Sequence, residues 1–215
     1  MARAKRVITI HVRDDREKEE FMRELQRLNL SAFIYVHGKL NDLKINVQGT
    51  KDEIRETIRR VREIHNKVSA KLYPDRRGLY RYTVDDLLRE ASASVSTPIL
   101  VKTLKLLGET VETSEGELVT SLPWEELVEV AGKLGEALSK ISLNTTRQIR
   151  EVVLPVAVAF NLDPEEVTNI LIDLGAAEWK EDKFKYELVK NKEQAMEILL
   201  NHLKGEENED RGHQA

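Results

Sequence analysis

Cysteine is absent from this chain of 215 residues, and no long apolar run occurs in it. The lack of cysteine excludes disulfide bonds, thiolate metal ligands and a cysteine nucleophile, and it fits a reducing compartment. The basic start of the chain leads into a short apolar stretch that Thr9 and His11 interrupt, so neither a signal peptide nor a membrane span is predicted there. We therefore expect a cytoplasmic protein that has no membrane partner.

Catalytic signatures are missing as well. The chain has no nucleophile elbow, no phosphate-binding loop, no glycine motif for dinucleotides and no zinc-protease helix motif. Three of its histidines, His11, His37 and His65, are too dispersed to indicate a metal site. We expect a protein that is not an enzyme and needs no cofactor or metal, and an enzyme remains the third alternative.

Charge, by contrast, is abundant and unevenly divided. Residues 1–82 hold 20 Lys and Arg against 12 Asp and Glu, a net charge of +8, whereas residues 83–215 hold 14 against 26, a net charge of −12. A basic part joined to an acidic part predicts nucleic acid as the partner of the first and protein as the partner of the second. The high content of Lys, Glu and Arg is also typical of heat-adapted proteins.

The first part carries the pattern of a ferredoxin-like sandwich. Strands are expected where apolar residues alternate with other residues, at 7–12, 32–37, 43–48 and 69–73. Between them lie two amphipathic helices, the first capped by Asp14 or Asp15 and the second by a capping box of Thr50 and Glu53. The order βαββαβ predicts a sheet with strand order 4-1-3-2 that has both helices on one face and leaves the other face uncovered.

The uncovered face of this predicted sheet gathers aromatic rings, amides and lysines, which are the groups that bind single-stranded RNA. Its members are Thr9, His11, Phe33, Tyr35, His37, Lys44, Asn46, Gln48, Lys71 and Tyr73. Of these, the candidates for RNA contact are His11, Tyr35, Lys44, Asn46, Lys71 and Tyr73. The alternative is an ordinary solvated face, or one that packs on the rest of the chain. The topology resembles an RNA recognition motif, although the aromatic pairs of that family are absent from the first and third strands.

Two arginine clusters are further candidates for RNA contact, namely Arg55, Arg59 and Arg62 on the second helix and Arg76, Arg77 and Arg81 after the last strand. The members of the first cluster are spaced at i, i+4 and i+7, so they form one line along the helix that can follow a phosphate backbone. Each cluster has a plainer alternative, because glutamates at i,i+4 spacing can pair with arginines and a linker needs only to be polar.

The acidic part shows the order helix, helix, hairpin, helix twice, which resembles tandem winged helices. Thr97 and Asp163 each precede a proline at the start of a helix, and each of these helices ends near a glycine, Gly108 or Gly175. Acidic residues on the predicted recognition helices and hairpins make DNA a less favoured partner than protein. Packing of this part on the basic module is the alternative.

We therefore predict an α+β protein with the following divisions: a ferredoxin-like domain at 1–76, a linker at 77–82, winged-helix-like units at 83–142 and 143–204, and a disordered tail at 205–215.

Residues 130–135, Val-Ala-Gly-Lys-Leu-Gly, resemble the GxxG loop with which a KH domain grips a nucleic-acid backbone, which makes Lys133 a candidate. Close packing between helices is the alternative explanation of Gly132 and Gly135.

The βαββαβ start, the segment YRYTVDDLLREA at 80–91 and the segment PILVKTLKLLGETVE at 98–112 together resemble a family of uncharacterised archaeal proteins. The resemblance carries no known activity, and it favours a role in information processing. The sequence thus predicts a non-catalytic RNA-binding protein associated with the ribosome or with RNA processing. The alternative is a protein-interaction or transcription-regulatory module.

Overall fold

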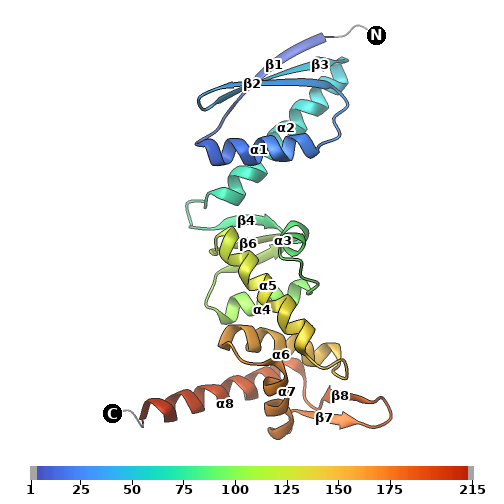
Figure 1. The fold of residues 1–215 in the computed structure, drawn as a ribbon, viewed down its shortest axis with the longest axis vertical. Coiled ribbons are helices and arrows are strands. Elements are labelled where there is room, and N and C mark those ends of the chain that lie inside the picture. The colour runs from blue at the N-terminus through green and yellow to red at the C-terminus, as the bar shows by residue number, and fades with distance from the viewer. Residues whose placement is uncertain (1–3, 213–215) are drawn as a thin grey trace. The chain divides into compact units, whose positions relative to one another are not determined.

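The computed structural model describes residues 4–212, with side chains through residue 205, as two units that divide between Tyr82 and Thr83. This division coincides with the boundary between the basic part, residues 1–82, and the acidic part, residues 83–215. Within the described residues the protein is a mixed α+β structure of helices and small sheets (Figure 1).

The first unit consists of β1 (Ala4–His11), α1 (Asp15–Arg27), β2 (Phe33–Lys39), β3 (Asp42–Gly49) and α2 (Lys51–Leu72). Its strands form an antiparallel sheet in the order β1-β3-β2, so β3 is central. Both helices lie on the same side of this sheet (Figure 1). The strand order agrees with the predicted one, apart from the fourth strand.

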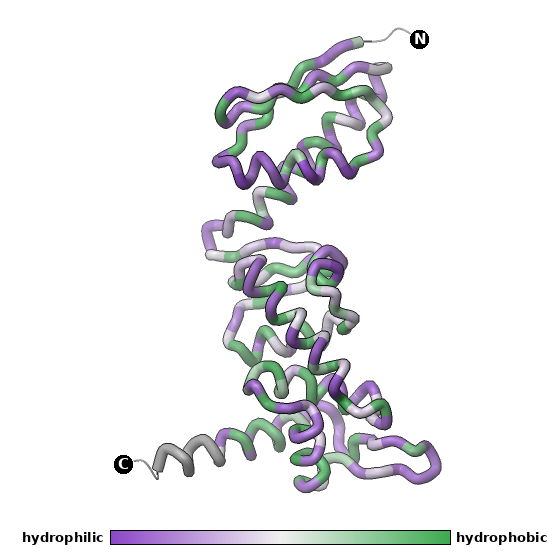
Figure 2. The backbone as a smooth tube through the Cα atoms, viewed as in Figure 1, coloured by the Kyte–Doolittle hydropathy of each residue, from purple (hydrophilic) through white to green (hydrophobic). Residues whose placement is uncertain are grey.

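Alternation along the strands builds the core of this unit. On the central strand, Leu43, Ile45 and Val47 are buried. They pack in one cluster with residues of both helices, among them Phe21 and Val61, which are fully buried. Figure 2 shows the corresponding mixture of hydrophobic and hydrophilic positions along the chain. Because α1 and α2 both bury their apolar stripes on one face, neither of them covers the opposite face of the sheet.

The predicted helix caps are confirmed. Asp14 accepts a hydrogen bond from the backbone N–H of Glu17 at 2.8 Å and thereby caps α1. Thr50 and Glu53 form the reciprocal capping box of α2, in which Thr50 Oγ1 accepts from the Glu53 N–H and Glu53 Oε2 accepts from the Thr50 N–H. Each side chain satisfies a backbone donor that has no partner within its own helix.

The fourth strand, predicted at residues 69–73, is wrong. These residues continue α2 as far as Leu72, and the Tyr73 N–H donates to the Ser69 carbonyl at 2.9 Å. Ala70, Lys71 and Leu72 favour a helix, and a helix already in progress extends more easily than a new strand pairs. The helix ends before Pro74 because the residue that precedes a proline is disfavoured in the helical conformation.

Part of the predicted linker at 77–82 forms a strand. Tyr80–Thr83 forms strand β4, which belongs to a three-stranded sheet with the order β4-β6-β5. The alternation Tyr-Arg-Tyr-Thr explains this strand, since Tyr82 is buried whereas Arg81 is exposed. The rings of Tyr80 and Tyr82 stack with their centroids 6.0 Å apart.

The second unit has the predicted order of helices and hairpins. Its elements are α3 (Val84–Glu90), α4 (Thr97–Leu106), β5 (Val111–Ser114), β6 (Glu117–Thr120), α5 (Trp124–Lys140), α6 (Arg147–Phe160), α7 (Pro164–Asp173), β7 (Ala177–Lys180), β8 (Lys185–Leu188) and α8 (Lys192–Gly212).

Helix α6 is the centre of this unit. Val152, Val153, Leu154 and Val156 are fully buried, and the helix packs against α4, α5, α7 and α8. The two predicted winged-helix-like halves therefore share one core around α6. Whether they descend from a repeat stays a prediction.

Helix α8 continues to Gly212, into the predicted disordered tail at 205–215. The residues from 205 to 212 are thus helical, although they were predicted as part of a disordered tail. The three glutamates and the arginine of this stretch favour a helix that has already been nucleated. Residues 213–215 of the predicted tail lie outside the described residues.

Two phenylalanines of the first unit allow a matched test of its core. Phe21→Ala is expected to destabilise this unit by about 3–5 kcal/mol, because it empties a fully buried position. Phe33→Ala removes a ring that is 68% exposed and should change the free energy of unfolding by no more than about 0.5 kcal/mol. Hydrogen exchange of the β1 and β3 amides in increasing urea measures the stability of this unit. Equal losses in the two variants would contradict the assignment of Phe33 to the surface.

Candidate nucleic-acid interface

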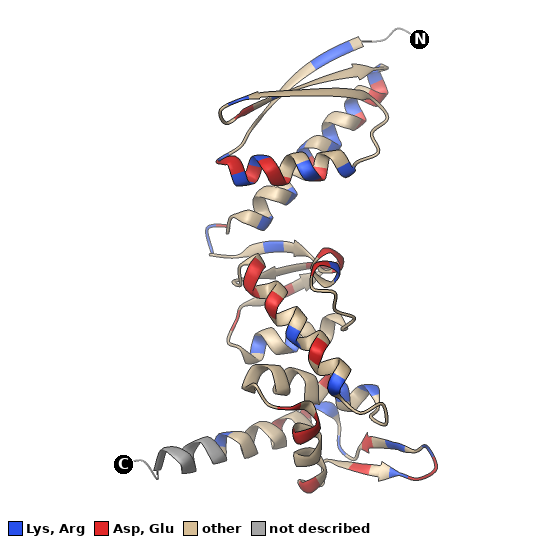
Figure 3. Cartoon of the chain, in the orientation of Figure 1, with Lys and Arg blue, Asp and Glu red and all other residues tan. Residues whose placement is uncertain are grey.

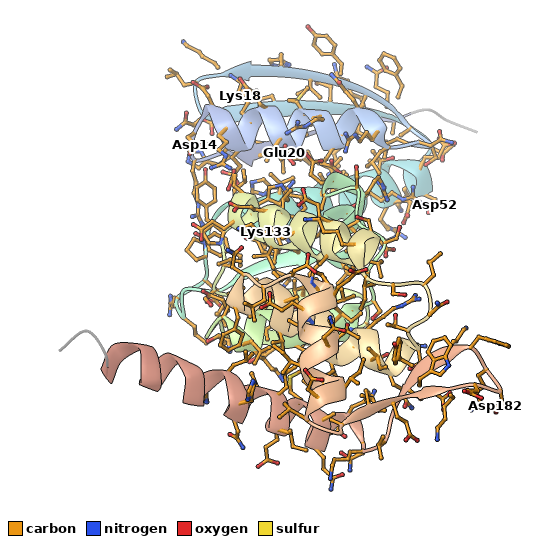
Figure 4. All side chains as sticks on the ribbon, turned by 60° about the horizontal axis from the view of Figure 1, so that its bottom comes forward. Asp14, Lys18, Glu20, Asp52, Lys133 and Asp182 are labelled. Carbon is orange, nitrogen blue, oxygen red and sulfur yellow. The ribbon has the colours of Figure 1, made fainter. Side chains whose placement is uncertain are left out.

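One face of the sheet of the first unit is covered by neither α1 nor α2, and we call it the open face. Its side chains alternate with the core residues along each strand. They are Lys5, Val7, Thr9 and His11 on β1, Phe33, Tyr35, His37 and Lys39 on β2, and Asp42, Lys44, Asn46 and Gln48 on β3. All except Asn46 are exposed, and Asn46 is half-buried. Figure 4 shows side chains that project from the sheet on the side away from α1.

The strand register arranges these twelve side chains in four rows across the sheet. The rows are Lys5–Gln48–Phe33, Val7–Asn46–Tyr35, Thr9–Lys44–His37 and His11–Asp42–Lys39. The first two rows carry the large apolar groups, and the last two carry most of the basic and titratable groups. The face is therefore graded from an aromatic end to a basic end.

The aromatic end exposes more apolar surface than a solvated face needs. Phe33 is 68% exposed, Tyr35 60% and Val7 51%. Tyr35 also lies next to His37, with the ring centroids 5.8 Å apart and the planes tilted by 31°. Rings held in this way on a rigid strand can accept a flat apolar ligand without further ordering.

Phe33 was in the predicted set of uncovered side chains, but it was not chosen as a site residue. The signal was available in the sequence, because Phe33 precedes Tyr35 by two residues and must share its face of the strand.

Two pairs of polar side chains on the open face lie within hydrogen-bonding distance of each other. Asn46 Nδ2 lies 3.4 Å from His37 Nδ1, and His11 Nδ1 lies 3.0 Å from Asp42 Oδ1. Among the side chains that the structure describes, Lys5, Lys39 and Lys44 have no ion-pair partner. A pocket at the basic end is lined by His37, Lys39, Leu40, Asn41, Asp42 and Lys44.

Four of the predicted site residues, His11, Tyr35, Lys44 and Asn46, do lie together on the open face. Lys71 does not, because it belongs to α2 and its Nζ lies 2.9 Å from Glu20 Oε1. The prediction that placed Lys71 on a fourth strand is corrected here, since Lys71 lies on the helical side of the sheet.

Tyr73 is the second correction. Its hydroxyl donates a 2.6 Å hydrogen bond to Asp14 Oδ2, and the guanidinium of Arg13 lies 4.3 Å from the centre of its ring. Burial, together with the hydrogen bond to Asp14, raises the pKa of Tyr73 to about 12. The same hydrogen bond lowers the pKa of Asp14. Tyr73 therefore joins the end of α2 to the cap of α1 and does not lie on the open face.

The arginines of α2 also lie away from the open face. Arg59 donates to Glu56 and to Glu63 at 2.7 Å each, and Arg55 lies 3.8 Å from Asp52. Hydrogen bonds from Arg59 and Arg60 lower the pKa of Glu56 to about 2. Figure 3 shows this mixture of acidic and basic residues along the helices of the first unit.

Of the predicted line of three arginines, Arg62 is exposed on α2 and has no ion-pair partner among the described side chains. The line is thus largely occupied by pairing within the helix, as the plainer alternative expected.

The remaining basic candidates are dispersed. Arg76 is exposed in the turn before β4, and Arg77 bonds to Asp75 in the same turn through both its backbone and its side chain. Arg81 is exposed on β4. The structure gathers none of these three with the open face.

The predicted KH-like loop is wrong, because residues 130–135 lie inside α5. Lys133, labelled in Figure 4, pairs with Glu129 at 2.7 Å within that helix. A side chain at Gly135 would approach the Cβ atom of Ala93 to 3.2 Å. Close packing therefore accounts for Gly135, and Lys133 is an ordinary surface residue of a helix.

The described residues offer no cluster of three or more histidine, aspartate or glutamate side chains that could bind a metal ion. None of the helices in that part of the chain combines the length and the apolar character that crossing a bilayer requires.

The role of Tyr73 can be tested by titration. In full-length protein, one phenol should titrate near pH 12, and Asp14→Asn should lower its pKa because the hydrogen bond to a carboxylate is lost. Since the folded pKa is raised, this contact stabilises the fold below the ordinary tyrosine pKa of about 10 and is lost as the pH rises towards 12. Absorbance at alkaline pH measures the titration, with Tyr35→Phe as the control on the open face. An unchanged titration in Asp14→Asn would refute the contact.

Known proteins resemble this chain as follows. A family model described as an uncharacterized protein conserved in archaea (DUF2067) matches residues 10–197. Uncharacterized protein MJ0388 of Methanocaldococcus jannaschii is 25% identical over 176 residues, which cover 80% of this chain and 82% of that protein. A chain in the crystal structure of the a/eIF2alpha–aDim2p–rRNA complex from Pyrococcus horikoshii OT3 is 14% identical, with a TM-score of 0.19, and the match covers 72% of this chain and 94% of that chain.

A TM-score of 0.19 carries no argument about fold or binding, so the assignment depends on the family model and the archaeal relative. The range that the family model matches begins in β1 and reaches into α8, and thus includes both units. On these grounds, the chain belongs to the DUF2067 family of proteins conserved in archaea.

Proposed function

We propose that this protein binds single-stranded RNA through the open face and carries out no catalysis. The observation that supports the proposal most is the pair of exposed rings, Phe33 and Tyr35, beside an amide and a lysine on one uncovered sheet. Aromatic rings stack on bases of any sequence, amides bond to base edges, and lysines neutralise phosphates.

The exposed rings are costly in water, which argues for a ligand. Each square ångström of apolar surface that a base covers contributes about 25 cal/mol. A stacked base is worth about 1–3 kcal/mol when the ring beneath it is removed by substitution to alanine. Two rings therefore suffice for a weak complex, and phosphate contacts add to it.

Electrostatics support nucleic acid over protein as the ligand of this unit. Its net charge is +8, and the cations on its helices are largely occupied by neighbouring carboxylates. Lys5, Lys39 and Lys44 of the open face lack such partners among the described side chains, and Asp42 is the one acidic residue in the four rows. The attraction for phosphate is thus concentrated on the face that carries the rings.

A ribosomal RNA or an RNA that is being processed stays the predicted target, and DNA stays the less favoured one. The acidic second unit fits this scheme as a region that contacts protein, because its carboxylates repel phosphate.

Two phenylalanines of similar exposure provide the test. Phe33→Ala in the full-length chain should weaken the binding of a labelled single-stranded RNA of twelve nucleotides by roughly 5- to 150-fold, the equivalent of one lost stack. Phe184→Ala, in the turn between β7 and β8 where the ring is 72% exposed, should leave that affinity unchanged. Fluorescence anisotropy measures both.

The affinity should also fall as the salt concentration rises, with a slope of about −0.7 in the logarithm for each phosphate that a lysine contacts. An RNA affinity that does not change with the salt concentration would overturn the proposal. So would an affinity that Phe184→Ala weakens as much as Phe33→Ala does.

A second candidate function is protein binding by the second unit, which one observation favours. The β7–β8 hairpin exposes Trp179, Phe184 and Val189, on a unit whose net charge is −12. Exposed apolar side chains on an acidic unit suit a partner protein that has a basic surface. Under this alternative, a partner protein should co-purify with the full-length chain after nuclease treatment. It should no longer co-purify with the Phe184→Ala variant, whereas it should still co-purify with Phe33→Ala. A partner that nuclease treatment removes would support RNA binding instead.

A further inference from the structure

Strand β2 presents three rings in succession on the open face. Phe33, Tyr35 and His37 occupy alternate positions, so their Cα atoms follow one another at about 7 Å, twice the rise per residue of a strand. All three side chains are exposed. Because β2 is an edge strand of its sheet, no other strand among residues 4–212 pairs with it on that side.

Each ring has one hydrogen-bonding side chain opposite it on the central strand β3. The register pairs Phe33 with Gln48, Tyr35 with Asn46 and His37 with Lys44. Side chains that lie directly opposite one another in an antiparallel sheet have Cβ atoms about 4.5–5.5 Å apart. A base that lies flat on one of these rings therefore has its edge within reach of the partner on β3.

We propose that β2 and β3 bind three consecutive nucleotides of single-stranded RNA, one base on each ring, with each base edge against the partner on β3. This inference rests on the proposed function and adds to it a footprint and an order. The strand of RNA runs along β2, and its sugar-phosphate backbone lies on the side of the open sheet edge.

The chemistry of the three partners differs, and this difference gives the site a base preference. Gln48 and Asn46 each offer an amide oxygen and an amide nitrogen, which match the donor and acceptor edges of adenine. Asn46 Nδ2 lies 3.4 Å from His37 Nδ1, which leaves its second hydrogen and its oxygen for a base. Lys44 offers donors alone, and guanine presents two acceptors on one edge. We therefore infer guanine at the nucleotide on His37.

The footprint can be read with RNA heptamers in which only the three central nucleotides carry bases, the flanking nucleotides being abasic. The three bases are removed one at a time, and each RNA is titrated against full-length wild type, Phe33→Ala, Tyr35→Ala and His37→Ala. Removing a base should weaken binding to wild type by roughly 5- to 150-fold. In each variant, one of the three removals should have no further effect, because the ring that held this base is already gone.

The order of the insensitive positions should follow the order of the rings along β2, in either direction of the RNA. Thr9→Ala is the matched control, because Thr9 is exposed on the same face beside Lys44 and carries no ring. At the position assigned to His37, guanine should bind about fivefold or more tightly than uracil, and Lys44→Met should abolish that preference.

The outcomes separate the two levels of the proposal. If neither the RNA of twelve nucleotides nor the heptamer that carries all three bases binds wild type, the proposed function itself fails. If the longer RNA binds but the heptamer does not, or if the heptamer binds but every variant responds equally to every removal, RNA binding stands and the ordered footprint is refuted.

Discussion

The alternation on β3 is the constraint on which the rest of the first unit depends. Its odd-numbered residues Leu43, Ile45 and Val47 are buried beneath both helices, which commits the even-numbered residues to the other face. Helices α1 and α2 both cover one side of the three-stranded sheet, so neither of them covers the second side. A slip of one residue would expose the core and bury lysine and amides. The core that makes the unit stable therefore also creates the uncovered surface that we assign to RNA.

The net charge of +8 distinguishes the first unit, but most of the arginines on its second helix are occupied by carboxylates of the same helix. Arginine and glutamate at i,i+3 and i,i+4 spacing on α2 bond to each other, as Arg59 does with Glu56 and Glu63. Lys71 is similarly held by Glu20 across the two helices. The lysines of the open face lie on strands, where every second residue belongs to the same face, and Asp42 is the one acidic residue in the four rows of that face. They are fewer than the arginines, yet they are better placed to attract phosphate.

The second unit follows a different plan, in which one buried helix organises the rest. Apolar residues run around most of α6, so it packs against helices from both predicted winged-helix-like halves. This leaves charged residues for the outside, and the acidic excess gives the unit a surface unlike that of a DNA-reading winged helix. One chain thus combines a basic sheet with an acidic helical unit, which is consistent with different partners for the two.

The sequence by itself determined the features that depend on near neighbours. These include the caps at Asp14 and Thr50, the three strands, the order of elements in the second unit, and the side of the sheet to which Tyr35, Lys44 and Asn46 belong. Tertiary structure decided what depends on distant partners. Residues 69–72 favour a helix locally, and contacts with distant residues hold them in it, since Leu72 packs against the core and Lys71 pairs with Glu20. Tyr73 bonds to Asp14, 59 residues earlier. The register that sets Gln48 opposite Phe33 likewise arises from pairing between strands. The turn and the shared core fix which residues lie opposite one another, and the periodicity of either strand alone does not show this pairing.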